Sequence, residues 1–227
     1  MARKRVAVMQ PYFFPYAGYF RLFAAVDEFV IFDCVQFPRR GRVHRTEVPR
    51  SGAGHEWLTL PLARQPRDVL IRELEFVSGA RAELDRRLAR LKWVETSAGP
   101  AAYRLRAHLH GALGSPIDFL EDGLRLVADL LGLAPRLSRS SALGLDPGLR
   151  GQDRVITAAA AVGATQYVNA PGGRGLYDAA EFVRAGIDLS FLCPYEGRFP
   201  HLLPALMSSD PQEIRADVLE TTRLLAP

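Results

Sequence analysis

Two short runs of mainly apolar residues, 6–9 and 28–32, limit most strongly how this chain can fold. Between them, over residues 18–26, apolar side chains recur at helical spacing. Continuous apolar runs of this length are typical of strands that are buried on both faces of a parallel sheet. Residues 6–33 therefore predict a strand, a helix and a second parallel strand, joined by a right-handed connection.

The alternation continues along the chain. Further strands are predicted at residues 69–76, 136–140, 166–168 and 187–192. Helices are predicted at residues 80–94, 101–113, 116–131, 153–162 and 176–184, and a last one begins at Asp210-Pro211. A hairpin is predicted over residues 42–62, with a flexible tip at 50–54.

This pattern predicts an α/β fold, with residues 1–227 forming a single three-layer domain. We expect a mainly parallel sheet of about five strands, with the first and second strands near its centre and helices on both faces. The arrangement is that of nucleotide-binding domains of the nucleotidylyltransferase or HUP-like type. The hairpin and the central helices, about residues 42–132, are expected to be an inserted subdomain.

Composition excludes several classes of protein. No apolar run approaches the roughly 20 residues of a membrane span, and the run after the basic N-terminus is too short for a signal peptide, so a cytoplasmic protein is expected. Two cysteines, Cys34 and Cys193, cannot form a disulfide framework or a four-cysteine zinc site. The net charge of +4 is spread along the chain, so it is only weak evidence for nucleic-acid binding.

The loop between the first strand and the first helix is unusually aromatic. Four aromatic residues lie within residues 12–16, at the strand end where ligands bind in open parallel sheets. It is interpreted either as an aromatic plug over the sheet or, preferably, as a ligand-binding loop. The candidate ligand contacts are Gln10, Tyr12, Tyr16 and Tyr19. Nucleotidylyltransferases place a His-x-Gly-His sequence at this point, where this chain has Tyr16-Ala-Gly-Tyr19. Because tyrosine carries no positive charge, adenylyl-transfer chemistry is expected to be altered or absent.

A basic cluster follows the second strand. Asp33 and Gln36 leave the strand end directly, and Arg40, Arg42 and Arg45 come next. Forked guanidinium groups suit a phosphate or carboxylate, although a solvated basic loop remains the alternative. His44 is interpreted as an exposed strand residue in preference to a general base.

Two later strand ends supply further candidates. Ser140 and Ser141 offer hydroxyl groups after one strand. Asn169 and Tyr177 flank a glycine-rich turn after another, which matches neither a dinucleotide-binding nor a P-loop spacing. The histidines are scattered, so no metal site is predicted, and no serine-hydrolase or zinc-protease motif occurs.

Several stretches closely resemble the WbqC-like family. They are V-A-V-M-Q-P-Y-F-F-P-Y-A-G-Y-F-R-L, V-D-E-F-V-I-F-D-C-V-Q-F, R-R-G-R-V-H-R, W-L-T-L-P-L, S-S-A-L, G-A-T-Q-Y-V-N-A-P-G-G-R-G-L-Y and G-I-D-L-S-F-L, in that order along almost the whole chain. The family is named for a gene of bacterial O-antigen clusters. The resemblance implies a cytosolic biosynthetic protein of a surface-polysaccharide or specialised-metabolite pathway.

The chain departs from the usual pattern of the family at two places. Arg42 stands where members usually carry an aromatic residue, and His44 and Thr46 stand where they carry amides. The segment from His201 to Met207, which includes Pro204, lacks the Ser and the Asp that usually precede a Leu-Met pair in this family. The resemblance therefore leaves the substrate, and activity itself, open.

Together these features predict a group-transfer enzyme that moves an acyl or aminoacyl group onto an amino or hydroxyl acceptor. The expected ligand is anionic and ring-bearing: a nucleotide, a nucleotide-sugar or an aminoacyl-adenylate, with tRNA as a further candidate partner and the cofactor unknown. Asp33 is expected to act as acid/base or to orient the acceptor, Arg45 to hold the anion, and Tyr16 to stack and hydrogen-bond. Substituting Asp33 or Arg45 is expected to spare stability. The alternatives are nucleotidylyl transfer and a non-catalytic nucleotide-binding or scaffold protein.

Overall fold

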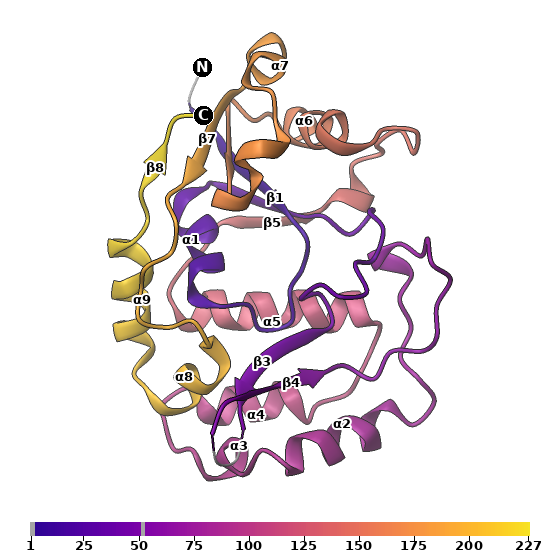
Figure 1. Ribbon diagram of the computed structural model, residues 1–227, viewed down its shortest axis with the longest axis vertical. Helices are drawn as coiled ribbons and strands as arrows, with labels where there is room; N and C mark the ends of the chain where they lie inside the picture. The colour runs from indigo at the N-terminus through magenta and orange to yellow at the C-terminus, as the bar shows by residue number, and fades with distance from the viewer. Residues whose placement is uncertain (1–2, 51–52) are drawn as a thin grey trace.

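The computed structural model describes residues 3–50 and 53–227, and its centre is a six-stranded sheet (Figure 1). The strands are β1 (Arg5–Met9), β2 (Glu28–Ile31), β5 (Arg136–Arg139), β6 (Gln166–Asn169), β7 (Asp188–Leu192) and β8 (Leu224–Leu225). Their order is β5-β2-β1-β6-β7-β8, and every neighbouring pair is parallel except β7 and β8. The mainly parallel sheet with β1 and β2 near its centre is confirmed, and β8 was not predicted.

Helices cover both faces of the sheet, as predicted (Figure 1). The helices are α1 (Ala17–Ala25), α2 (Ala80–Ala89), α3 (Lys92–Thr96), α4 (Ala102–Leu109), α5 (Pro116–Leu130), α6 (Gly151–Ala161), α7 (Ala179–Arg184), α8 (Leu202–Ser208) and α9 (Pro211–Glu220). Successive side chains of β1 point to opposite faces. Val6 and Val8 pack in the cluster that contains α6 and α7, whereas Ala7 packs with α1 and α5.

The predicted hairpin is confirmed as β3 (Arg45–Pro49) and β4 (His55–Thr59), which pair antiparallel. Residues 51 and 52, at its expected flexible tip, lie outside the described residues. The hydroxyl of Thr46 donates a hydrogen bond of 2.8 Å to the carbonyl of Phe14. Phe14 is the one described non-glycine residue with a positive φ, 43°. The inserted hairpin therefore holds the aromatic loop of residues 10–20 in a conformation that costs backbone energy.

Several predicted elements differ in the structure. The strand predicted at 69–76 is wrong: this segment contains the 3₁₀ helix η1 (Ile71–Glu73) and forms only the single bridges Gln36–Leu70 and Leu62–Phe76. Its apolar side chains, such as Ile71, are buried in the main hydrophobic cluster without a partner strand. The helix predicted at 80–94 divides into α2 and α3, because Leu91 leaves helical geometry at ψ 74°.

The C-terminal third differs in detail as well. The helix predicted from residue 176 begins later, since the Asp178 side chain caps α7 by accepting a hydrogen bond from the amide of Ala180. Before it, η3 (Pro171–Leu176) is a 3₁₀ turn. The final helix begins as predicted at the Asp210 cap, whereas α8 was not predicted.

Candidate functional site

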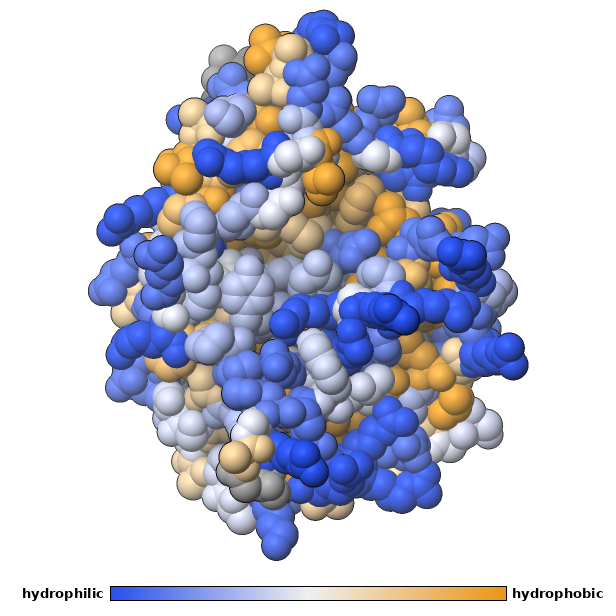
Figure 2. All heavy atoms as spheres, in the orientation of Figure 1, coloured by the Kyte–Doolittle hydropathy of each residue, from blue (hydrophilic) through white to orange (hydrophobic). Residues whose placement is uncertain are grey.

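A cleft of about 770 Å³ opens at the carboxyl ends of the parallel strands. In Figure 2 it appears as a hollow with orange and tan atoms below α6. Residues that directly follow β1, β2 and β5 line it. Numbered along the chain, the strands of this sheet lie in the order 3-2-1-4-5-6, the order of doubly wound dinucleotide-binding domains, in which ligands bind at this edge.

The cleft brings together five of the residues singled out in the sequence. They are Gln10, Gln36, Ser140, Ser141 and Tyr177. The side-chain amide of Gln36 donates to the carbonyl of Arg67 at 2.8 Å, which ties one wall to segment 64–68. Tyr177 packs edge-on against Tyr167, with ring centroids 6.0 Å apart. Polar and aromatic groups from separate strand ends therefore converge on one hollow.

Asp33 lies beneath the floor of the cleft rather than in it. Its side chain is fully buried, whereas the expectation that substituting Asp33 spares stability suits an exposed charge. Its Oδ1 accepts hydrogen bonds from the Ser140 hydroxyl at 2.8 Å and from the Ser141 amide at 2.9 Å. Its Oδ2 accepts one from the Ser141 hydroxyl at 2.6 Å. Asp33 therefore reaches the cleft only through Ser140 and Ser141, which both line it.

The other wall of the cleft is basic. Arg72, Arg150 and Arg154 line it, whereas Asp68 is its one lining carboxylate among the described residues. Arg154 is only 8% exposed, and its guanidinium donates to carbonyls, including that of Pro147 at 2.9 Å. No ion pair to Arg154 is found within residues 3–50 and 53–227. An unneutralised buried charge makes this wall attractive to an anion.

The same wall contains the start of α6. Gly151 and Gln152 line the cleft, and the helix has no side-chain N-cap hydrogen bond. Its N-terminal dipole adds to the arginine charge. Arg150 and Arg154 were not identified from the sequence as candidate site residues. The signal that could have indicated them is their position at the start of a helix that follows a strand of the parallel sheet.

The arginines of the basic cluster lie elsewhere. Arg45 donates to the carbonyl of Gly41 at 3.1 Å, and its guanidinium lies 4.3 Å from the centre of the Trp57 ring. Arg42 lies 5.2 Å from the same ring. Arg40 is exposed, and its carbonyl accepts a hydrogen bond from Arg45. None of these three is among the described residues that line the cleft, and Arg45 instead stabilises its own loop.

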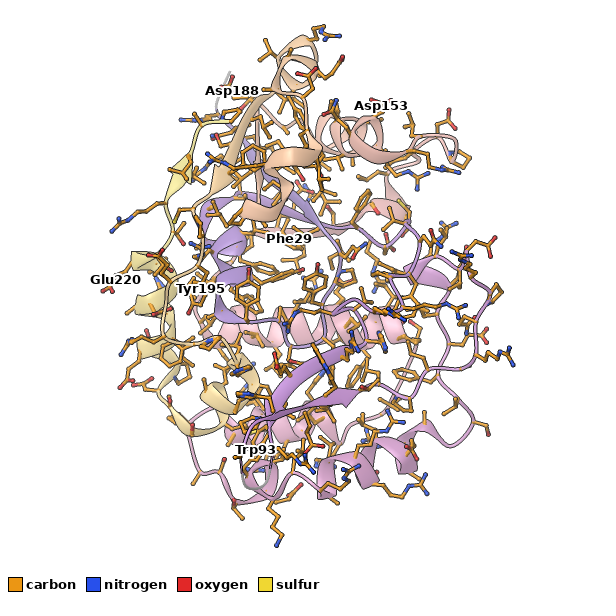
Figure 3. The ribbon with its side chains drawn as sticks, in the orientation of Figure 1. Phe29, Trp93, Asp153, Asp188, Tyr195 and Glu220 are labelled. Atoms are coloured by element: carbon orange, nitrogen blue, oxygen red, sulfur yellow. The ribbon has the colours of Figure 1, made fainter. Side chains whose placement is uncertain are left out.

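The tyrosines of the first loop pack around the loop itself. The hydroxyl of Tyr19 donates to the carbonyl of Gln10 at 2.8 Å, and burial raises the pKa of Tyr19 well above its usual 10. The ring of Tyr12 lies 5.3 Å from that of Tyr19. Tyr16 packs edge-on against Tyr195, which lies beside α1 in Figure 3. The structure thus places Tyr19 as a support for Gln10 and does not bring Tyr12 or Tyr16 into the cleft lining.

Asn169 supports the glycine-rich turn. Its side-chain carbonyl accepts from the amide of Ala170 at 2.8 Å. A Cβ atom on Gly173 would lie 2.2 Å from Nδ2 of Asn169 and 3.2 Å from the Tyr177 ring. Only glycine fits between these two side chains, so the turn positions Tyr177 at the cleft.

His44 is half-buried, so its interpretation as an exposed strand residue is wrong. It precedes β3, packs edge-on against Phe37 with centroids 5.0 Å apart, and lines a separate groove. Burial, and then the charge of Arg45, lower the pKa of His44 from 6.5 to about 4.

We expect His44 to make folding sensitive to acid. Because its pKa is lower in the folded chain, its stabilising contribution is complete above pH 6.5 and is lost as the pH falls toward 4. Since the ring is only partly buried, the loss should be about 1–2 kcal/mol after solvent screening. Urea unfolding of wild type and His44→Gln at pH 7.5, 5.5 and 4.5 measures it. A stability difference between the two proteins that stays constant over this range would contradict the assignment.

Three comparisons place the chain among known proteins. A family model described as the WbqC-like protein family matches residues 10–202. An uncharacterized protein of Mycobacterium tuberculosis is 27% identical over 213 residues, which cover 86% of this chain and 84% of that protein. No solved structure matches. Within residues 3–50 and 53–227, no helix is both long and apolar enough to cross a membrane.

Proposed function

The chain belongs to the WbqC-like protein family, and we propose that it is a biosynthetic group-transfer enzyme that uses the cleft as its active site. The observation that carries the proposal is the cleft itself: three arginines against one aspartate, facing hydroxyl, amide and aromatic groups at the carboxyl edge of a parallel sheet. The family name hints at a biosynthetic role. The donor is an acyl- or aminoacyl-adenylate, an anionic and ring-bearing metabolite of the nucleotide class.

The lining supports this choice of donor. Guanidinium groups bind phosphate oxygens in forked geometry, and Arg150 stands beside the N-terminus of α6, which favours the same charge. Arg154 adds its positive charge, while its own donors are bonded to backbone carbonyls. Tyr177 and Leu145 offer an aromatic and an aliphatic surface for a planar ring. Gln10 and Gln36 offer amide groups that can hold hydroxyls. A volume of about 770 Å³ suits a ligand of this size.

The transferred group is an acyl or aminoacyl group. The amine or hydroxyl of the acceptor attacks the carbonyl carbon, and the bond from that carbon to the donor's phosphate oxygen breaks. The proton of the acceptor passes to the Ser141 hydroxyl, whose own proton moves along its 2.6 Å hydrogen bond to Asp33. The phosphate leaves with its negative charge, which Arg150 and Arg154 stabilise.

Donor binding is tested by calorimetric titration of the full chain with AMP and ATP, which carry the adenylate portion of the donor. Arg150→Ala is expected to weaken binding by at least tenfold, since a charge-assisted hydrogen bond contributes about 1.5–3 kcal/mol. Its guanidinium donates only to nearby carbonyls such as that of Leu149, at 2.8 Å, so folding should be spared. Arg125→Ala, on the exposed side of α5, is the matched control. Absence of binding by the wild type, or equal weakening in both variants, would overturn the choice of donor.

Turnover separates an enzyme from a binding protein. With an aminoacyl-adenylate labelled in its AMP portion as the donor, release of radiolabelled AMP is measured for wild type and Ser141→Ala. We expect similar affinity but at least 100-fold slower release in the variant, because the proton relay is broken while the basic wall remains. Tight binding without release in the wild type, across amine and hydroxyl acceptors, would favour a non-catalytic role.

A further inference from the structure

A second hollow lies in the insert, apart from the cleft. This groove, of about 780 Å³, is formed by the loop before β3, by the segment after β4, and by α2 with the residues that precede it. Segment 64–68 contributes Arg64 and Gln65 to the groove and Asp68 to the cleft. The two hollows are therefore neighbours on opposite sides of this segment, and each has its own lining residues.

The groove is strongly basic. Its lining contains four arginines and a single carboxylate, that of Glu83; the arginines are Arg39, Arg64, Arg86 and Arg87. Arg87 pairs with Glu83 at 2.8 Å and donates to the carbonyl of Thr59 at 2.6 Å, so it is fixed between α2 and the hairpin. Arg86 shares the same carboxylate. Glu83 can neutralise only one of the four charges.

Two of these arginines, Arg39 and Arg64, are available to bind an anion. Arg39 donates to the carbonyl of Gln65 at 2.7 Å, and this contact leaves its charge uncompensated. Neither Arg39 nor Arg64 forms an ion pair within residues 3–50 and 53–227. Both are exposed at the rim of the groove. The repulsion between these like charges is relieved when an anion enters.

One residue that lines the groove also has a polar atom without a hydrogen-bond partner. Nδ1 of His44 is buried and has no hydrogen-bond partner among the described residues. A buried polar atom without a partner costs free energy. Because this atom is enclosed in the protein, the contacts to a ligand in the groove come from the arginines.

We propose that this groove is a second binding site, for the phosphate or diphosphate group of a small molecule. Arginine suits this chemistry, because its planar fork matches two phosphate oxygens at once. Several guanidinium groups around one hollow favour a group with two or more negative charges over a single carboxylate. The site is separate from the donor cleft, so its test does not depend on the proposed reaction.

The test is calorimetric titration of the full chain with inorganic pyrophosphate at 150 mM NaCl. The double variant Arg39→Ala/Arg64→Ala is expected to lose at least tenfold in affinity. The control is Arg125→Ala/Arg184→Ala, which removes the same charge from α5 and α7 and should bind as the wild type does. Thermal melts confirm that both double variants fold.

Arg150→Ala separates the groove from the cleft, and it should leave pyrophosphate binding at the groove intact. Three results would overturn the proposal: no binding by the wild type, an equal loss in the control double variant, or a loss confined to Arg150→Ala. The last result would place all anion binding in the cleft, whereas failure of the cleft to bind nucleotides would leave the groove unaffected.

Discussion

Replacing Arg21 by Ala is expected to lower the free energy of unfolding by about 4 kcal/mol. The side chain is fully buried on α1. Its guanidinium donates to the carbonyls of Cys193 and Thr221, each at 2.7 Å, and lies 5.3 Å from the centre of the Tyr195 ring. Removing it leaves these carbonyls without their donor and opens a cavity between α1, the segment after β7 and the end of α9.

Urea unfolding followed by circular dichroism measures this effect. Arg21→Lys should lose about half as much, because a single ammonium group keeps the charge but cannot reach both carbonyls in fork geometry. Arg184→Ala, whose side chain is 65% exposed, is the surface control and should change stability by less than about 0.5 kcal/mol. A loss below about 1 kcal/mol in Arg21→Ala would show that these carbonyls find other donors.

The sheet could be predicted because its signal is local. Residues 6–9 and 29–32 are continuously apolar because both faces of β1 and β2 are covered, so burial of the strands can be read from consecutive residues. The segment around Ile71 also carries buried apolar residues, yet it forms only isolated bridges and has no neighbouring strand. The pattern of apolar residues indicates which side chains are buried, but it does not indicate whether a partner strand is present.

The position of the site could be predicted from the sequence, but the roles of its residues could be predicted only in part. Gln10, Gln36 and Ser141 were found because residues that follow parallel strands meet at one edge. The roles of charged residues depend on partners that are distant along the chain. Ser140 and Ser141 lie 107 and 108 residues from Asp33, and nothing near Arg45 in the sequence indicates the Trp57 ring that it covers.

Replacing Asp33 by Ala is expected to lower the free energy of unfolding by about 3 kcal/mol, which for a chain of this length lowers Tm by roughly 10 °C. This reverses the expectation from sequence that substitutions at Asp33 spare stability. The carboxylate accepts three hydrogen bonds in a fully buried position, and they hold the end of β5 against the end of β2. Without it, the amide of Ser141 loses its acceptor inside the protein.

Two further variants separate stability from function at this position. Asp68→Ala, at an exposed carboxylate that lines the cleft, should leave Tm unchanged. Asp33→Asn keeps the shape and one acceptor oxygen, so it should lose about 1–2 kcal/mol and still fold at 25 °C. Because an amide cannot accept the proton from Ser141, nucleotide release by this folded variant should fall as far as in Ser141→Ala. If Asp33→Asn instead turned over at the wild-type rate, the buried carboxylate would serve only to join the two strand ends, and the proton would have to leave by another group in the cleft.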